Sequence, residues 1–268
     1  MKQKKSNFMR IIVILICITI LFFSLFQIVK VKINDKKEAE KFEILRERVS
    51  EEKNTDNDNK QDGNFVAEVV PTTKNKDERN PYKEIYQTNN DLVGWISIAD
   101  TPIDYPVMST PGNPNYYLRR NFDKEYSLSG TPFIGDGLSP ESKSFIIYAH
   151  NMKNKTMFGT LENYKDIDYK NNHKYIVFNT LNENKVYEVI GAFHTEIDEG
   201  NPNLFKYYNY CGNLEREQME EFIHKISDIS IYGKLRDITY ENQIMMLSTC
   251  SYFADEGRFI VVAKRIQN

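Results

Sequence analysis

The feature that most constrains this chain is an uninterrupted apolar run near its N-terminus. Residues 11–29, IIVILICITILFFSLFQIV, carry no charge, and four Lys or Arg residues lie in the ten residues before them. A helix of this length crosses a hydrocarbon core of about 30 Å. The run is longer than the apolar region of a cleaved signal peptide, and no small-residue cleavage pattern follows it. The sequence therefore predicts an uncleaved signal-anchor helix.

The composition then changes twice along the chain. Residues 35–53 are strong helix formers with opposite charges three and four positions apart, which predicts a solvated helical stalk. The next 27 residues, 54–80, are rich in Asn, Asp, Lys and Thr without apolar periodicity, as in a flexible spacer. We therefore predict four parts: a tail (1–10), the anchor (11–29), a stalk and spacer (30–79) and a folded domain (80–268).

The folded domain is predicted to be mainly β with a few helices. Asn80 as a cap and Pro81 at the first helical position indicate a helix start, with Ile85 and Tyr86 on its buried side. Many short runs of aromatic and β-branched residues between turns favour a barrel or a sandwich. Strands are expected at 93–98, 103–108, 144–150, 174–179, 185–195, 244–249 and 258–266, and helices around 156–164 and at 214–227.

Charge and cysteine usage exclude several classes of function. The formal net charge is −3 and no long basic patch is present, so a nucleic-acid partner is not expected. The three cysteines, Cys17, Cys211 and Cys250, form neither a disulfide framework nor a paired metal-ligand pattern, and the four histidines do not lie at zinc-like intervals from them. Carboxylates do not cluster at the spacing of a calcium loop. We expect no metal and no other cofactor.

Cys250 has the sequence context of a reactive thiol. It ends the apolar run IMMLST, and Arg258 opens the next apolar run after a short polar loop. An exposed strand end admits a substrate, and a nearby cation favours the thiolate. Arg258 has two possible roles: a surface ion pair with Asp255 or Glu256, or binding of a substrate carbonyl or oxyanion.

A nucleophilic cysteine needs a proton-handling partner, which is often distant in the sequence. His150 is the strongest candidate because it ends the apolar run SFIIYAH, so it leaves the core at the same kind of position as Cys250. His173 lies in a polar turn and is expected at the surface. His194 lies within or at the end of a strand, and His224 lies on a charged helix.

Taken together, these motifs resemble the sortase family. LSTC at a strand end matches most of the family pattern TLxTC, with Met246 in place of the first Thr. An arginine follows after seven residues, and YAHNM lies about a hundred residues upstream. DLVGWISI, IDYPV and NYYLRRNF resemble the N-terminal part of class B sortases, and the helix at 214–227 resembles the insertion of that class. The resemblance covers roughly residues 80–266.

The resemblance implies an eight-stranded β-barrel with its active site at one end. In such an enzyme Cys250 would be the nucleophile, His150 the general acid and base, and Arg258 the group that binds substrate and stabilises the oxyanion. It also implies a substrate-binding surface that includes Tyr148, Thr249, Asn115 and Leu118. Sortases are single-pass membrane proteins of Gram-positive bacteria, so the tail would be cytoplasmic and the domain extracellular, an orientation that the lysines on both sides of the anchor leave open.

The implied reaction is a transpeptidation without a cofactor. The enzyme would cleave an Asn-Pro-x-Thr or similar sorting motif of a secreted protein after its Thr, form a thioester on Cys250, and pass the acyl group to an amine of peptidoglycan or of a pilin. Two alternatives remain: a secreted cysteine hydrolase, such as a papain-like peptidase or wall amidase, and a membrane-tethered wall-binding or adhesion domain without catalysis. A papain-like enzyme places its cysteine before its histidine and at the start of a helix, which is the reverse of the order here.

Overall fold

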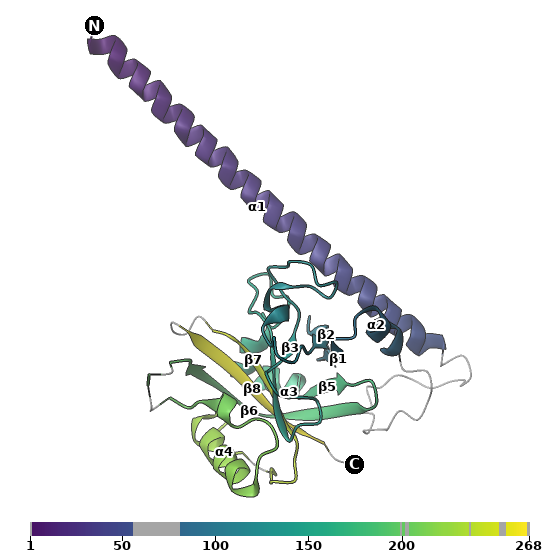
Figure 1. The fold of residues 1–268 in the computed structure, drawn as a ribbon. Helices are drawn as coiled ribbons and strands as arrows, with labels where there is room; N and C mark the ends of the chain where they lie inside the picture. The colour runs from purple at the N-terminus through teal and green to yellow at the C-terminus, as the bar shows by residue number, and fades with distance from the viewer. Residues whose placement is uncertain are drawn as a thin grey trace. The chain divides into compact units, whose positions relative to one another are not determined.

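The N-terminal part of the chain is one continuous helix. The computed structural model describes residues 2–55, 81–198, 200–201, 204–235, 237–251 and 256–266. Helix α1 (Lys2–Thr55) runs without a break through the predicted anchor and the predicted stalk (Figure 1). Its segment Ile14–Glu51 is long and apolar enough to cross a membrane, and the side chains of its most apolar window are not buried. The predicted spacer lies almost entirely outside the described residues.

The chain divides into two compact units, Met1–Ile44 and Leu45–Asn268, and the second unit contains a closed β-barrel. The order of strands around the barrel is β1-β2-β3-β4-β7-β8-β6-β5, which confirms the predicted eight-stranded barrel. The sequence analysis missed only β3, which has two residues and therefore shows no periodicity. The strands are β1 (Leu92–Ser97), β2 (Asp104–Met108), β3 (Phe133–Ile134), β4 (Ser144–Tyr148), β5 (Tyr175–Asn179), β6 (Asn184–Glu196), β7 (Ile244–Cys250) and β8 (Gly257–Arg265).

Two pairings set the position of the site. Strands β4 and β7 are parallel, with Tyr148 opposite Ser248 at the last pair of the ladder, so the segments that follow both strands leave the barrel at the same end. Strands β7 and β8 are antiparallel, with Cys250 opposite Arg258. Residues from three strands therefore meet at one end of the barrel, which we call the site end.

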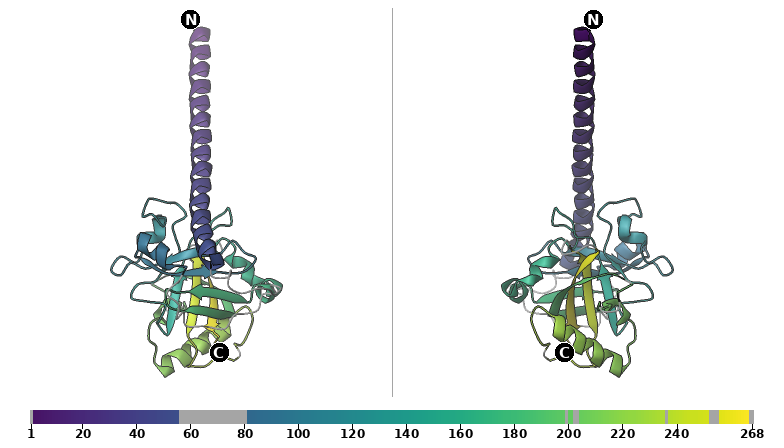
Figure 2. Two further views of the ribbon diagram at one scale, coloured as in Figure 1. Left: turned by 90° about the vertical axis from the view of Figure 1, so that its right-hand side faces the viewer. Right: turned by 90° about the vertical axis from the view of Figure 1, so that its left-hand side faces the viewer.

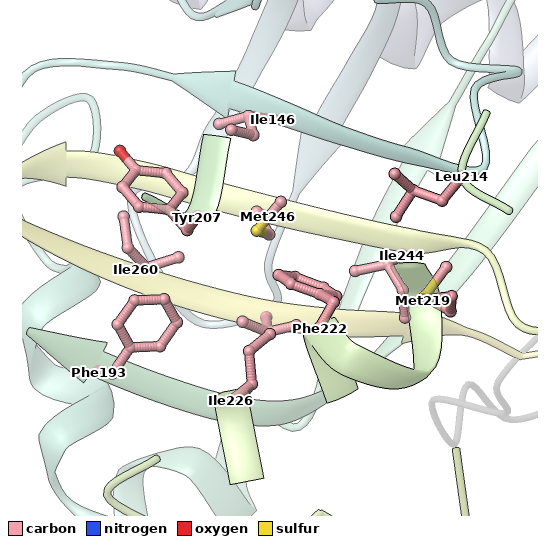
Figure 3. Close-up of a cluster of buried hydrophobic side chains, with 11 residues drawn as sticks. Ile146, Phe193, Tyr207, Leu214, Met219, Phe222, Ile226, Ile244, Met246 and Ile260 are labelled. Atoms are coloured by element: carbon pink, nitrogen blue, oxygen red, sulfur yellow. The ribbon is translucent and has the colours of Figure 1, made fainter. Parts of the chain in front are cut away.

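Helix α4 (Arg216–Ile229) lies between β6 and β7 in the sequence and packs against β6 (Figure 2). Met219, Phe222 and Ile226, spaced three and four residues apart, form its buried face, as the periodicity predicts. Figure 3 shows these side chains against Met246 and other core residues. Burial of each such side chain contributes about 1.5–3 kcal/mol, so this face holds α4 on the barrel.

The remaining helices are short, and two expectations need correction. Helix α2 (Lys83–Thr88) begins after Tyr82, so the prediction of Pro81 as its first residue is wrong, and Asn80 lies outside the described residues. Tyr82 is buried and its ring stacks on Trp95, so packing of this side chain sets where the segment enters the barrel. The helix expected around 156–164 begins only at Leu161. The other elements are η2 (Tyr116–Arg119), η3 (Leu161–Lys165), α3 (Ile167–Asn172) and η4 (Tyr207–Asn209).

Candidate active site

Cys250 is the last residue of β7 and its only exposed one. The six residues before it, Ile244 to Thr249, are buried, because the strand passes through the core before it reaches the site end. The fold thus brings a thiol out of a rigid strand into contact with solvent. This agrees with the exposed strand end that the sequence predicts for the nucleophile.

His150 lies two residues beyond the end of β4, just as Cys250 lies two residues beyond Ser248 in the parallel strand. Its Nε2 is 2.8 Å from the backbone oxygen of Leu118. A carbonyl oxygen can only accept, so Nε2 carries a proton and, in the neutral ring, Nδ1 is the basic atom. Burial lowers the pKa of His150 below 6.5; the bond to Leu118 opposes this shift, and the charge of Arg119 adds to it. The neutral imidazole therefore predominates at neutral pH.

Arg258 faces Cys250 across the antiparallel pair β7–β8. Its Nη1 donates to its neighbour's backbone oxygen, that of Gly257, at 2.9 Å, and its Nη2 lies 3.1 Å from a carboxylate oxygen of Glu256. The arginine side chain is 20% exposed but that of Glu256 is 70% exposed, so solvent screens this ion pair and it holds the guanidinium only weakly. The ion pair with Glu256, one of the two roles considered for Arg258, is present, whereas Asp255 lies outside the described residues.

Two tyrosines lie near the guanidinium. Burial raises the pKa of Tyr148, at the end of β4, and the positive charge of Arg258 partly opposes that shift. Burial also raises the pKa of Tyr207 to about 12, against the effects of its hydrogen bond to Ser248 and of Arg258. The Tyr207 hydroxyl and Ser248 Oγ are 2.9 Å apart. Both phenols are therefore protonated at neutral pH and can donate hydrogen bonds.

The other predicted substrate-binding residues occupy different environments. Asn115 is exposed and precedes η2, and its backbone oxygen accepts from the amide of Leu118 at 3.1 Å. Leu118 has an exposed side chain, and its carbonyl orients His150. Thr249, in contrast, is 2% exposed, and its hydroxyl donates to the backbone oxygen of Ala149 at 2.8 Å. The structure thus places Thr249 between strand ends rather than on the exposed surface.

The sequence analysis did not single out Asn151. Its Nδ2 donates to the backbone oxygen of Cys250 at 2.9 Å, so the residue after the histidine contacts the cysteine main chain directly. The available signal was its position, next to His150 in YAHNM, but nothing in the sequence indicates which group its side chain binds. Ser248 and Tyr207 were missed for the same reason.

This arrangement of strands and side chains matches a known family. The family model of the sortase domain matches residues 96–266. The chain belongs to the sortase family. The curated sortase B of Staphylococcus aureus is 26% identical over 99% of both chains, and sortase B of Listeria monocytogenes is 29% identical over 75% of this chain and 80% of the relative.

The solved structures agree on the fold. The Staphylococcus aureus sortase B–substrate complex has a TM-score of 0.67 at 24% identity and covers 88% of this chain and 99% of that one. With the sequence relatives, this establishes a class B sortase, a cysteine transpeptidase. The sortase barrel also excludes the papain-like fold considered above.

The remaining cysteines of this sortase differ from Cys250. Burial raises the pKa of Cys211 to about 12, so this half-buried thiol stays protonated and unreactive at neutral pH. Cys17 lies in the apolar part of α1. Among the residues that the structure describes, no group of three His, Cys, Asp or Glu side chains is placed to hold a metal ion.

The three other histidines have structural surroundings. His224 is exposed at the surface of α4, and its Nδ1 is 3.2 Å from Asp228. His173 is half-buried rather than solvated, because it closes α3 and stacks on Tyr169 with ring centroids 4.0 Å apart. His194 lies in β6, and its Nδ1 is 3.3 Å from Oγ of Ser251, the residue after Cys250.

Proposed function

We propose that this sortase cleaves a C-terminal sorting motif of the Asn-Pro-x-Thr type in secreted proteins. The Cys250 thiolate attacks the threonine carbonyl carbon, and a carbon–sulfur bond forms while the carbonyl oxygen becomes an oxyanion. Arg258 stabilises this charge with its fixed donors. The carbon–nitrogen bond then breaks, and His150 donates a proton from Nδ1 to the leaving amine. The product is a thioester on Cys250.

The second half of the proposed reaction transfers the acyl group to an amine of peptidoglycan or of a pilin. The amine attacks the thioester carbon and gives its proton to Nδ1 of His150, and the cysteine leaves as a thiolate. A sortase B structure complexed with triglycine, with a TM-score of 0.68 and 24% identity to this chain, favours a glycine-type amine as the acceptor. Since burial keeps His150 mainly neutral, only a fraction of the enzyme carries both charges of the ion pair at neutral pH.

The observation that carries the proposal is the meeting of three groups from three strands. Cys250 ends β7, Arg258 faces it from β8, and His150 follows β4, which runs parallel to β7. A nucleophile, a permanent cation and an imidazole with one defined basic nitrogen are what acyl transfer requires. A wall-binding domain without catalysis has no need for this convergence.

We also propose the location and the division of the chain. The apolar helix anchors the protein, with residues 1–10 in the cytoplasm and residues 80–268, the catalytic domain, outside the cell. Residues 30–79 then give the site reach toward secreted proteins and the wall. External protease added to intact cells or spheroplasts should remove the domain and leave the tail protected, whereas an internal domain would survive until lysis.

The test of the activity uses the full chain in detergent. A quenched fluorescent peptide containing Asn-Pro-Gln-Thr-Asn is incubated with and without triglycine, and products are identified by mass spectrometry. Cleavage after Thr and a triglycine-ligated product are expected, both absent in Cys250→Ala. Related peptides with Pro-x-Thr-Gly run in parallel to distinguish motifs.

Each other result has a clear meaning. Cleavage without a ligated product at any amine concentration would identify a hydrolase. If none of the peptides is cleaved and Cys250 does not react with thiol reagents, the tethered wall-binding domain is favoured.

A further inference from the structure

Side chains replace the backbone ladder where the catalytic residues lie. The regular pairing of β4 with β7 ends at Tyr148 and Ser248, before either His150 or Cys250 is reached. One longer backbone bond follows, from the amide of Ala149 to Ser248 at 3.3 Å. Beyond it, the Thr249 hydroxyl donates to Ala149 at 2.8 Å and the Asn151 carboxamide donates to Cys250 at 2.9 Å.

We infer that Asn151 is a positioning residue of this sortase, whose carboxamide fixes the main chain of Cys250 relative to His150. The inference rests on the proposed function, because it concerns the geometry of that reaction. Asn151 joins the two segments that carry the nucleophile and the acid-base group, and it does so one residue from His150. A displacement of about 1 Å between reacting groups can cost about 100-fold in rate, so a link at this point has a large effect on catalysis.

The base of Asn151 is itself held to the barrel. Asn151 forms a backbone bridge with Met157, and the amide of Phe158 donates to the oxygen of His150 at 3.0 Å. Met157 and Phe158 are both buried, so the turn returns to the core directly after it passes the site. The carboxamide therefore extends from a fixed backbone and is oriented before substrate binds.

The chemistry of the contact requires a donor. The oxygen of Cys250 is an acceptor, and an amide NH2 supplies the proton. An aspartate of the same shape places a second acceptor against it when ionised and supplies a proton only when protonated. The Asn151→Asp variant therefore carries a pH signature that a purely steric role does not.

The first experiment compares Asn151→Ala and Asn151→Asp with wild type in the full chain in detergent. We expect kcat to fall by about 10- to 100-fold with KM within about threefold, because positioning rather than substrate contact is lost. The activity of Asn151→Asp relative to wild type should rise as pH falls from about 7 to about 4.5, as its carboxyl group protonates. Asn154→Ala is the matched control, since the side chain of Asn154 bonds Thr156 within the same turn, and it should retain wild-type kcat.

The second experiment does not depend on the peptide substrate. Alkylation of Cys250 by iodoacetamide is followed by peptide mass spectrometry, with the half-buried Cys211 as a control whose labelling would report loss of structure. The ratio of the rates in wild type and in His150→Asn measures the influence of the imidazole on the thiol. We expect this ratio to approach one in the Asn151→Ala background.

The two experiments separate the possible failures. If no peptide is cleaved by wild type but the alkylation ratio depends on Asn151, the proposed function fails and the positioning role stands. A ratio of one in wild type, an equal ratio in both backgrounds, or an unchanged kcat in Asn151→Ala with normal peptide cleavage overturns the inference. A fall in kcat accompanied by the same fall in Asn154→Ala also overturns it.

Discussion

The two ends of the barrel use charged residues in opposite ways. At the site end, Arg258 is held by its own neighbours and by the exposed carboxylate of Glu256. At the other end, where β4 and β7 begin, Lys185 is 0% exposed, and its ammonium group donates to Pro140 at 2.8 Å and to Glu141 at 2.9 Å. The Arg258 side chain is partly exposed, whereas that of Lys185 is enclosed.

The polar contacts around Lys185 form a continuous network. The Gln243 amide donates to Pro140 and Ser142, each at 2.8 Å, and accepts from Tyr187 at 2.9 Å. Arg265 bonds Glu183, which also lies 3.8 Å from Lys185. The buried members of this network, Lys185 and Tyr187, are satisfied in this way, which fixes one arrangement of the segments that they join. This end of the barrel, which we call the closed end, therefore anchors the strands whose opposite ends form the site end.

Removal of the Cys250 thiol, the proposed nucleophile, should have the largest effect on activity. Cys250→Ala should lower kcat by about 10⁴-fold or more, because no other described thiol is both exposed and at a strand end of the barrel. The melting temperature should stay within about 2 °C, since the side chain is exposed. Peptide cleavage and thermal melting measure the two quantities. Residual cleavage above a few per cent would place the nucleophile elsewhere.

Removal of the Arg258 guanidinium should have the next largest effect on kcat. Arg258→Ala should lower kcat by about 10²- to 10³-fold, which is typical of the loss of an oxyanion donor. Arg258→Lys should recover only part of the rate, because an ammonium lacks the planar set of donors. Glu256→Gln is the matched variant, because it removes the carboxylate that pairs with Arg258 and leaves the guanidinium in place. A large loss in Glu256→Gln would show that the carboxylate itself takes part in the reaction.

The site could be predicted from sequence where its residues lie at the ends of recognisable strands. Cys250, His150 and Arg258 each lie at the boundary of an apolar run, and their order along the chain matches the family. The contacts that hold them could not be predicted: the bond of Asn151 to Cys250 spans 99 residues, and that of His150 to Leu118 spans 32. Such bonds depend on strand register, which no local pattern specifies.

The elements of the fold also differ in how well the sequence predicts them. Alternation and turn residues located seven of the eight strands, but β3 is too short to show a period. The short helices were placed less well, because the start of α2 depends on the packing of Tyr82 against Trp95 and not on the predicted cap. The burial of Lys185 could not be predicted, since a lysine at the start of a strand is normally exposed.

The closed end offers the converse test of the comparison. Lys185→Met keeps the length of the side chain but removes the ammonium, and we expect the free energy of unfolding to fall by about 2 kcal/mol. The kcat of the folded enzyme should stay within about twofold, because the change lies at the end opposite Cys250. Urea unfolding followed by fluorescence of the single tryptophan, Trp95, measures the first quantity. A loss of kcat beyond that range in the folded enzyme would mean that the two ends are coupled.

The smallest predicted effect is on how the free energy of unfolding depends on pH, which should respond to histidines at the site end. Burial lowers the pKa of His194, at the site end, below 6.5; the charge of Glu162 opposes the shift and that of Lys165 adds to it. Burial lowers the pKa of His150 in the same direction. Between the folded-state pKa and 6.5 the unfolded chain binds more protons than the folded one, so stability rises with pH in that window. This stability is fully present above 6.5 and is lost as pH falls through the folded-state pKa.

We therefore expect His194→Gln to flatten the dependence of unfolding free energy on pH below 6.5. The same urea unfolding curves, collected at intervals from about pH 7.5 to about pH 5, measure the slope. His224→Gln serves as the surface control, because that side chain is 79% exposed. Lys185→Met should shift the whole curve downward, since it removes the buried contacts of the ammonium group and leaves both histidines in place. If instead it changes the slope and His194→Gln does not, the pH sensitivity belongs to the closed end and the contrast between the two ends is wrong.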